Sequence, residues 1–277
     1  MTAITATDAR RGAVPPEIGR LAGIRRVFEY RLVAYRRTFR SSIFNSFIGP
    51  ALFLAAMGVG LGGYVDRSGN DLLDVSYLAF LAPGLLAATA MQTASFESTF
   101  PIMGGLVWSR VFHAMYATPI RPADIALGNL AWIAFRILLV STVFVLVTVL
   151  FGAAASPLIV LAIPVAVLTG LAFAGPIAAY AATQRTMENF SAVFRFGITP
   201  LFLFSGTFFP IESLPVFLQP IAWLTPLYHG VALSRGLSLG TATDPLVLVI
   251  HLGVLLAFIV VGAAAAVRTV ERKLVRG

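Results

Sequence analysis

The sequence has no cysteine and only one lysine, Lys273, in 277 residues. Without cysteine the chain can form no disulfide, no thiolate metal site and no thiol nucleophile. The phosphate-binding P-loop needs a Gly-Lys-Ser/Thr sequence, but Lys273 stands between Arg272 and Leu274. The chain therefore cannot bind ATP through that motif, and any ATP-driven activity requires a partner protein.

Catalytic and metal-binding patterns are scarce as well. There is no HExxH motif, and no apolar run contains two carboxylates. The three histidines, His113, His229 and His251, are far apart in the sequence and are expected on different faces. We therefore predict no metal site and no catalytic residue.

Charged residues are few, and this scarcity defines the class of protein. They make up 12% of the chain, hydrophobic residues make up 58%, and the mean hydropathy is +0.88. Soluble domains carry about 25% charged residues, and one helix needs about 20 apolar residues to cross a bilayer. Short alternating segments typical of a membrane barrel are missing. The sequence thus predicts an all-α integral membrane protein.

The apolar runs predict six transmembrane helices. Short re-entrant helices are expected on the outer side before the last span, because Phe204–Gly236 contains a proline every five or six residues. The stretch 101–124, between the second and third spans, is expected in the cytoplasm. The predicted spans cover residues 43–63, 75–100, 125–151, 158–183, 190–209 and 245–267.

The flanking charges predict the orientation. Arginines are concentrated before the first apolar run, and basic residues, among them Arg268 and Arg272, follow the last one. Positively charged flanks stay on the cytoplasmic side, so both termini are expected inside a multi-pass protein of the cytoplasmic (inner or plasma) membrane. The net charge of +8 fits contact with anionic lipids better than nucleic-acid binding. The charged leader is too long for a signal peptide.

The regions outside the spans differ in character. Residues 1–20 are predicted to be a disordered tail, 41–268 the transmembrane domain and 269–277 a basic cytoplasmic tail. Residues 21–40 have apolar positions at spacings of three and four, which predicts an amphipathic helix lying in the membrane interface. That helix either anchors the chain or also contacts a cytoplasmic partner. Its apolar stripe comprises Leu21, Ile24, Phe28, Leu32, Tyr35 and Phe39.

Two charges are expected at membrane depth, where they are costly and often functional. Glu97 is predicted near the inner end of the second span, and Arg136 well inside the third. They form either a structural pair or part of a substrate path. With Gln92 and Thr93, Glu97 makes the second span the expected wall of a polar cavity.

Two series of residues resemble the permease subunits of ABC-2-type exporters, and the resemblance is closest to the nodulation-type lipo-oligosaccharide exporter permeases. Together they cover about residues 28–268. One departure is Asn129, at a position where an acidic residue is frequent in the family. The first series is Phe96–Thr99, Ala114-Met115, Pro119, Asp124-Ile125, Leu127-Gly128 and Ala131-Trp132. The second is Thr199-Pro200, Leu203–Gly206, Phe209-Pro210, Leu214-Pro215, Pro226-Leu227, His229 and Arg235.

The resemblance implies a type V exporter-like fold and an assembly of two permease copies, identical or homologous, with two separate ATPase subunits that bind ATP and Mg²⁺. No cofactor is expected in this chain itself. The cargo would be lipid-like, a lipo-oligosaccharide or an amphiphilic drug. The resemblance implies ATPase coupling at Arg25, Arg26, Arg36, Trp108, Arg110, His113, Met115 and Tyr116. It implies a substrate path along Gln92, Thr93, Glu97, Arg136, Phe202 and Phe204, and an outer gate at Phe209, Pro210, Trp223, Tyr228 and His229.

Some alternatives remain open from sequence. The Phe-rich fifth span suits an apolar or amphiphilic cargo, but also plain lipid contact and helix packing. A polytopic membrane enzyme would need clustered polar residues at one interface. An ion-coupled secondary transporter would favour carboxylates at mid-membrane, deeper than the position expected for Glu97.

Overall fold

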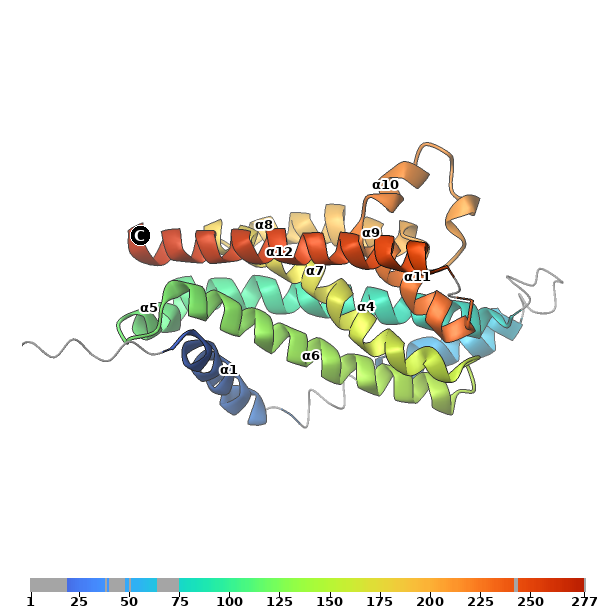
Figure 1. Ribbon diagram of the computed structural model, residues 1–277, viewed down its shortest axis with the longest axis horizontal. Coiled ribbons are helices and arrows are strands. Elements are labelled where there is room, and N and C mark those ends of the chain that lie inside the picture. The colour runs from blue at the N-terminus through green and yellow to red at the C-terminus, as the bar shows by residue number, and fades with distance from the viewer. Residues whose placement is uncertain are drawn as a thin grey trace, which may run out of the picture.

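The structure is a computed structural model that describes residues 19–37, 39, 48–49, 51–63, 75–241 and 244–276. In these residues all regular structure is helical (Figure 1). The expected disordered tail, 1–20, lies almost wholly outside them. The helices are α1 (Arg20–Arg36), η2 (Ala56–Gly62), α4 (Tyr77–Met103), η5 (Gly104–Trp108), α5 (Val111–Tyr116), α6 (Pro122–Leu150), η6 (Pro157–Leu161), α7 (Ala162–Thr183), α8 (Glu188–Ala192), η7 (Val193–Ile198), α9 (Thr199–Phe204), η8 (Ile211–Ser213), α10 (Gln219–Trp223), α11 (Pro226–Leu239) and α12 (Pro245–Arg276).

Four helical stretches of the described chain are long and apolar enough to cross a membrane: Tyr77–Trp108, Pro122–Leu150, Pro157–Thr183 and Pro245–Arg276. They correspond to the predicted second, third, fourth and sixth spans, and they make this a multi-pass helical membrane protein. The predicted first span is described only from Ala51 onward, apart from residues 48–49.

The predicted fifth span, 190–209, is shorter than expected. Helical structure there runs through α8, η7 and α9 and ends at Phe204. The chain then turns at Gly206, whose φ of 80° is a left-handed conformation that glycine adopts without strain. The π-helical segment η7 lies in the middle of this stretch.

The helix that begins at Tyr77 is longer than predicted. The expected cytoplasmic stretch starts at Pro101, but α4 continues through Pro101 to Met103, and the π-helical segment η5 extends it to Trp108. Proline is tolerated inside membrane helices because neighbouring groups satisfy the freed backbone. Separately, Arg31 Nη2 on α1 donates to the Pro101 carbonyl oxygen at 3.4 Å, which ties α1 to this part of the helix.

The long helices form one bundle with α7 near its centre, in contact with α4, α6, α11 and α12. Burial differs sharply between its members. In the most apolar window of the helix that begins at Tyr77, 78% of the residues are buried inside the protein, against 11% for α12. The first therefore packs among other helices, whereas most of α12 is left for lipid.

Glycine permits the closest crossing in the bundle, between α7 and α12. A Cβ atom on Gly175 would lie 2.5 Å from the backbone carbon of Gly262, so the two backbones touch. Membrane helices associate largely through such close van der Waals packing at small residues. This crossing fixes the last helix against the centre of the bundle.

The two ends of the bundle differ. The C-terminal end of α12 lies beside the short helix α5, and α1 runs obliquely along α6 toward the same end, whereas α10 protrudes at the opposite end (Figure 1). Two positions of the predicted apolar stripe are exposed, Leu21 at 83% and Phe39, beyond the end of α1, at 43%, and Gly23 and Val27 are the buried residues of α1. The contact with α6 shifts the buried face by part of a turn.

Candidate transport and docking sites

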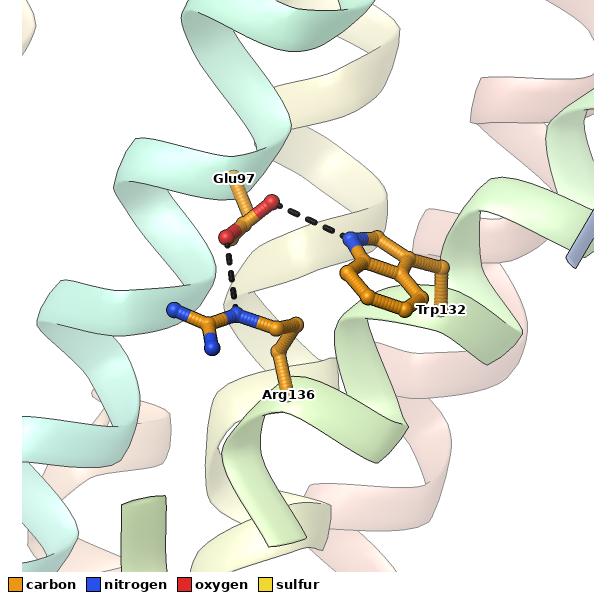
Figure 2. A network of polar contacts seen from close by, with 3 residues as sticks. All are labelled: Glu97, Trp132 and Arg136. Atoms are coloured by element: carbon orange, nitrogen blue, oxygen red, sulfur yellow. Dashed lines mark hydrogen bonds and ion pairs between the residues drawn. The ribbon is translucent and has the colours of Figure 1, made fainter. Parts of the chain in front are cut away.

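A polar cluster joins α4 to α6 in the interior of the bundle (Figure 2). Arg136 Nε donates to Glu97 Oε1 at 3.1 Å, and Trp132 Nε1 donates to Glu97 Oε2 at 3.3 Å. The side chains of Arg136 and Glu97 are 13% and 22% exposed. Each carboxylate oxygen thus has a donor, and the two charges that the sequence placed at membrane depth form an ion pair.

Helix geometry explains how the cluster forms. Trp132 and Arg136 are four residues apart on α6, so both side chains project from one face toward α4. Glu97 lies roughly three helical turns before Trp108, because the helix is longer than predicted. The carboxylate is therefore farther from the end of the helix than the sequence suggested.

The N-terminal helix α1 covers this cluster from the side. The guanidinium carbon of Arg136 lies 4.6 Å from the centre of the Tyr35 ring, a cation–π contact. The Tyr35 ring also packs on Trp132, with centroids 5.4 Å apart, and Phe28 packs on Trp132 at 6.0 Å. The surface helix therefore touches the ion pair directly and does more than lie on the membrane.

A second polar link ties α1 to α6. Arg31 Nε donates to Asn129 Oδ1 at 2.8 Å, and Asn129 Nδ2 donates to the Ile125 carbonyl oxygen at 2.7 Å. Burial lowers the pKa of Arg31 from its ordinary value, and the nearby negative charge of Glu97 partly offsets this. The buried Asn129 thus provides an acceptor for Arg31.

Packing brings α1 within reach of the α6 backbone. A Cβ atom on Gly128 would lie 2.6 Å from Val27 Cβ, so the absence of a side chain at Gly128 lets α1 approach. The exposed arginines of α1 face away from this contact. Arg25 forms an ion pair with Glu29, Nε to Oε1 at 2.7 Å, and Arg26 and Arg36 are exposed.

The expected ATPase-coupling residues lie at the same end of the bundle. Trp108 is 53% exposed and Tyr116 is 41% exposed, while His113 and Met115 are half-buried. Arg110 is exposed and has φ 49°, a left-handed backbone conformation that begins α5. The segment from the end of η5 through α5 thus presents three large exposed side chains, Trp108, Arg110 and Tyr116.

A cavity of about 280 Å³ brings together the two regions expected to contact an ATPase. Tyr30 and Arg31 line it from α1, and Trp108, Ser109 and Phe112 line it from the other side. The sequence treated these as two separate contacts. In the structure the two regions line one cavity, and Trp108 is the expected coupling residue among those that line it.

The remaining residues of the predicted substrate path lie on two elements, α4 and α9. Gln92 and Thr93 are half-buried on α4. Phe202 packs on Phe208 with centroids 5.0 Å apart, and Phe204 is 43% exposed at the end of α9. Their role in a path stays a prediction.

At the opposite end, the predicted outer-gate residues lie in the segment from Phe209 to α11. Phe209, Pro210 and Tyr228 are half-buried, Trp223 is 46% exposed, and His229 is buried. His229 Nε2 lies 2.9 Å from the Trp223 carbonyl oxygen, which joins α11 to α10.

Arg235 holds this end together. Its Nε donates to the Phe80 carbonyl oxygen at 3.2 Å, and its Nη2 donates to the Gly206 carbonyl oxygen at 2.8 Å. Its guanidinium carbon also lies 3.8 Å from the centre of the Phe80 ring. One side chain thus connects α11, the start of α4 and the turn after α9.

Several contacts escaped the sequence analysis. The sequence analysis named Trp132 only as part of the family motif and did not predict its contact with Glu97. The four-residue spacing between Trp132 and Arg136 could have indicated that both lie on one face of the helix. Nothing in the sequence linked Tyr35 to Arg136. The expectation that the histidines lie on different faces is wrong for two of them, because His229 and His251 are in contact.

Comparison with known proteins gives the class. The ABC-2 type transporter model matches residues 24–239, which include most of α1, the ion pair and α11. The chain therefore belongs to the ABC-2 family of transporter membrane proteins.

Relatives within the family narrow the branch. The chain is 34% identical to Nodulation protein J of Rhizobium leguminosarum bv. viciae over 90% of this chain and 94% of that protein. It is 32% identical to Nodulation protein J of Rhizobium meliloti, over 90% and 92%. It is 24% identical to the inner membrane transport permease YadH of Escherichia coli, over 78% and 83%. The nodulation-type branch resemblance is confirmed.

Proposed function

We propose that this chain is the non-catalytic transmembrane subunit of an ATP-driven exporter that moves a lipid-like, lipo-oligosaccharide or amphiphilic drug cargo outward. Family membership supports this reading, since ABC transporters pair membrane subunits with ATPase subunits. The observation that carries it is the cavity that α1 and the η5–α5 turn line together, because this chain has no P-loop and must receive its energy through a contact.

The proposed assembly contains two such chains and two ATPase subunits, which bind ATP and Mg²⁺. Closure of the ATPases would move α1 and α5, and the spans would tilt as rigid bodies. The contacts of Tyr35 and Arg31 with α6 provide a physical connection from α1 to the interior. The permease itself needs only two states that differ in affinity for cargo.

The proposed topology has six spans and places both termini in the cytoplasm. The membrane would be the inner or plasma membrane. The α8–η7–α9 stretch and the helix that contains η2 would be the two further spans. On this topology α10 and α11 form the re-entrant outer segment. Both α1 and the end of α12 lie at the α5 end of the bundle, which agrees with an even number of crossings (Figure 1).

The second permease copy is proposed to cover an apolar face that the single chain leaves open. Phe196 is 77% exposed on η7, Phe96 is 55% exposed on α4, and Leu52 is 66% exposed. Phe96 stacks on Phe194 with centroids 4.6 Å apart, so α4 and η7 share this face. Cargo would pass between the two copies along it.

Co-purification tests the docking surface. Trp108→Ala combined with Arg110→Ala removes two exposed side chains without touching the core, so the expected result is loss of the ATPase subunit from the purified complex. Trp223→Ala, an exposed tryptophan at the opposite end, is the matched control and should keep the ATPase. Retention by the double variant would contradict the proposed docking surface. Transport by this chain alone down an ion gradient would contradict the function.

The two alternative classes, an ion-coupled secondary transporter and a polytopic membrane enzyme, receive little support from the structure. An ion-coupled transporter would favour a mid-membrane carboxylate, but that of Glu97 is held by Arg136 and Trp132. A Gly-x-Ser-x-Gly sequence at Gly236–Gly240 resembles a hydrolase motif, yet Ser238 is buried and lies inside α11. A nucleophile of that type sits at an exposed strand-to-helix turn.

A further inference from the structure

Two histidines connect the outer segment to the last helix. His229 on α11 and His251 on α12 face each other, with their Nδ1 atoms 2.7 Å apart. The other ring nitrogen of His229, Nε2, lies 2.9 Å from the Trp223 carbonyl oxygen at the end of α10. The series from Trp223 through His229 to His251 therefore spans three helices.

The partners fix how protons are distributed in this series. A carbonyl oxygen only accepts, so His229 Nε2 carries a proton and donates it to Trp223. In the neutral ring the other nitrogen is then an acceptor. His229 Nδ1 accordingly accepts from His251 Nδ1–H. The neutral pair satisfies both contacts with one proton between the rings.

The neutral histidine pair can bind one further proton and keep the hydrogen bond between the two Nδ1 atoms, but it cannot bind a second and keep that bond. If either ring becomes cationic, one Nδ1–H still points at an unprotonated Nδ1, and the hydrogen bond becomes charge-assisted. If both rings are cationic, both Nδ1 atoms carry protons 2.7 Å apart and neither can accept. The two rings then repel one another, and the α11–α12 contact is lost.

We propose that His229 and His251 form a proton-binding latch that holds α11 against α12 when at most one ring is charged and releases it when both are. Because the second proton binds next to an existing positive charge, its binding requires a more acidic medium than binding of the first. The contact is complete at neutral pH and is lost as the pH falls.

The surroundings contain few other charges to interfere. The Tyr228 ring lies 5.3 Å from His229 and 5.8 Å from His251, centroid to centroid. Arg235 and Asp244 line a cavity of about 360 Å³ with His251, and this cavity gives protons a route to the pair.

The other elements packed on α11 and α12 carry few titratable side chains. On α6 they are Asp124 and Arg136, and on α5 they are His113 and Tyr116. By sequence, α10 and η6 carry no titratable side chain. Glu212 lines a separate cavity with Tyr228 and Arg235. The only titratable side chains on α7 and α4 are Tyr180, Tyr77 and Glu97, and Glu97 is paired with Arg136.

Distance measurement on the full-length chain in phosphatidylcholine nanodiscs tests the latch. The chain has no cysteine, so spin labels at Ile221→Cys on α10 and Val247→Cys on α12, both exposed positions, report one distance. Between pH 7.5 and pH 4.5 the distance distribution is expected to shift to longer values.

Variants separate the latch from a general effect of acid. His251→Gln, and His251→Asn as a second version, keep a side chain that can donate to His229 but cannot be charged, so the acid shift should disappear. His113→Gln, which removes the third histidine at the opposite end, should shift as the unaltered chain does.

An unchanged distance in the unaltered chain over this pH range, or the same shift in both His251 variants, would overturn the proposal. Nanodiscs expose both faces of the bilayer to buffer. The result is therefore independent of the proposed transport function and of which face is outside.

Discussion

At the scale of single residues, the ion pair of Glu97 and Arg136 is the feature with the largest consequences. Both side chains are mostly buried, and both are held by further contacts, Glu97 by Trp132 and Arg136 by the Tyr35 ring. Breaking a buried pair by removing one partner is costly because the remaining charge stays desolvated. The pair is therefore best tested with single and double replacements.

Glu97→Gln should destabilise the protein by about 3 kcal/mol, because Arg136 would keep its charge without a carboxylate. The double variant Glu97→Gln with Arg136→Gln should recover a large part of that loss, since no unpaired charge remains. Thermal unfolding of the purified protein measures both. A double variant no more stable than Glu97→Gln would show that the two residues act independently.

Asn129 offers a second residue-scale test. Asn129→Leu removes the acceptor of Arg31 Nε and should cost about 1.5–3 kcal/mol, because a charged donor is left unsatisfied. Asn129→Asp keeps an acceptor for the guanidinium of Arg31, so it should retain more stability than Asn129→Leu. Thermal unfolding of the purified protein compares the stability of the two variants. Equal loss in both variants would mean that the size of the side chain, and not its acceptor oxygen, matters.

At the scale of elements, the crossing of α7 and α12 sets how the last helix packs. Gly175→Ala places a Cβ atom 2.5 Å from the Gly262 backbone, and backbone cannot move aside cheaply. The expected loss is about 1–3 kcal/mol, the usual cost of overpacking. Gly253→Ala, on α12 with no atom within 4 Å of the new Cβ, is the matched control and should be neutral or slightly stabilising. Equal effects at the two positions would contradict the close crossing.

At the scale of the whole molecule, orientation in the membrane is the main open prediction. Because the chain lacks cysteine, single cysteines introduced at Val216, which is 80% exposed between η8 and α10, and at Arg276, the exposed end of α12, carry unique labels. A membrane-impermeant maleimide should label Val216→Cys in intact spheroplasts and Arg276→Cys only in inside-out vesicles. Labelling of both from the same face would contradict the proposed topology.

Much of the helical framework could be predicted from sequence. Long apolar runs give α6, the η6–α7 stretch and the start of α12 nearly at their observed bounds, because a bilayer imposes both length and helical structure. The last helix continues to Arg276, nine residues beyond the predicted end of the span at 267. Local rules failed at Pro101, where proline predicts the end of a helix but the helix continues for roughly two more turns. They failed also for Leu21, because the position of α6 and not the stripe itself decides which side of α1 is buried.

The sequence by itself determined the class of this protein: a polytopic helical membrane chain without its own ATP-binding motif, recognisable as an ABC-2 permease. Composition and motif order suffice for that, since they depend only on residues along the chain. The tertiary structure alone decided which distant side chains meet. Tyr35 with Arg136 and Arg31 with Asn129 join helices about 100 residues apart in sequence, and His229 with His251 joins two consecutive helices. Such contacts depend on the crossing of packed helices, which no local pattern encodes.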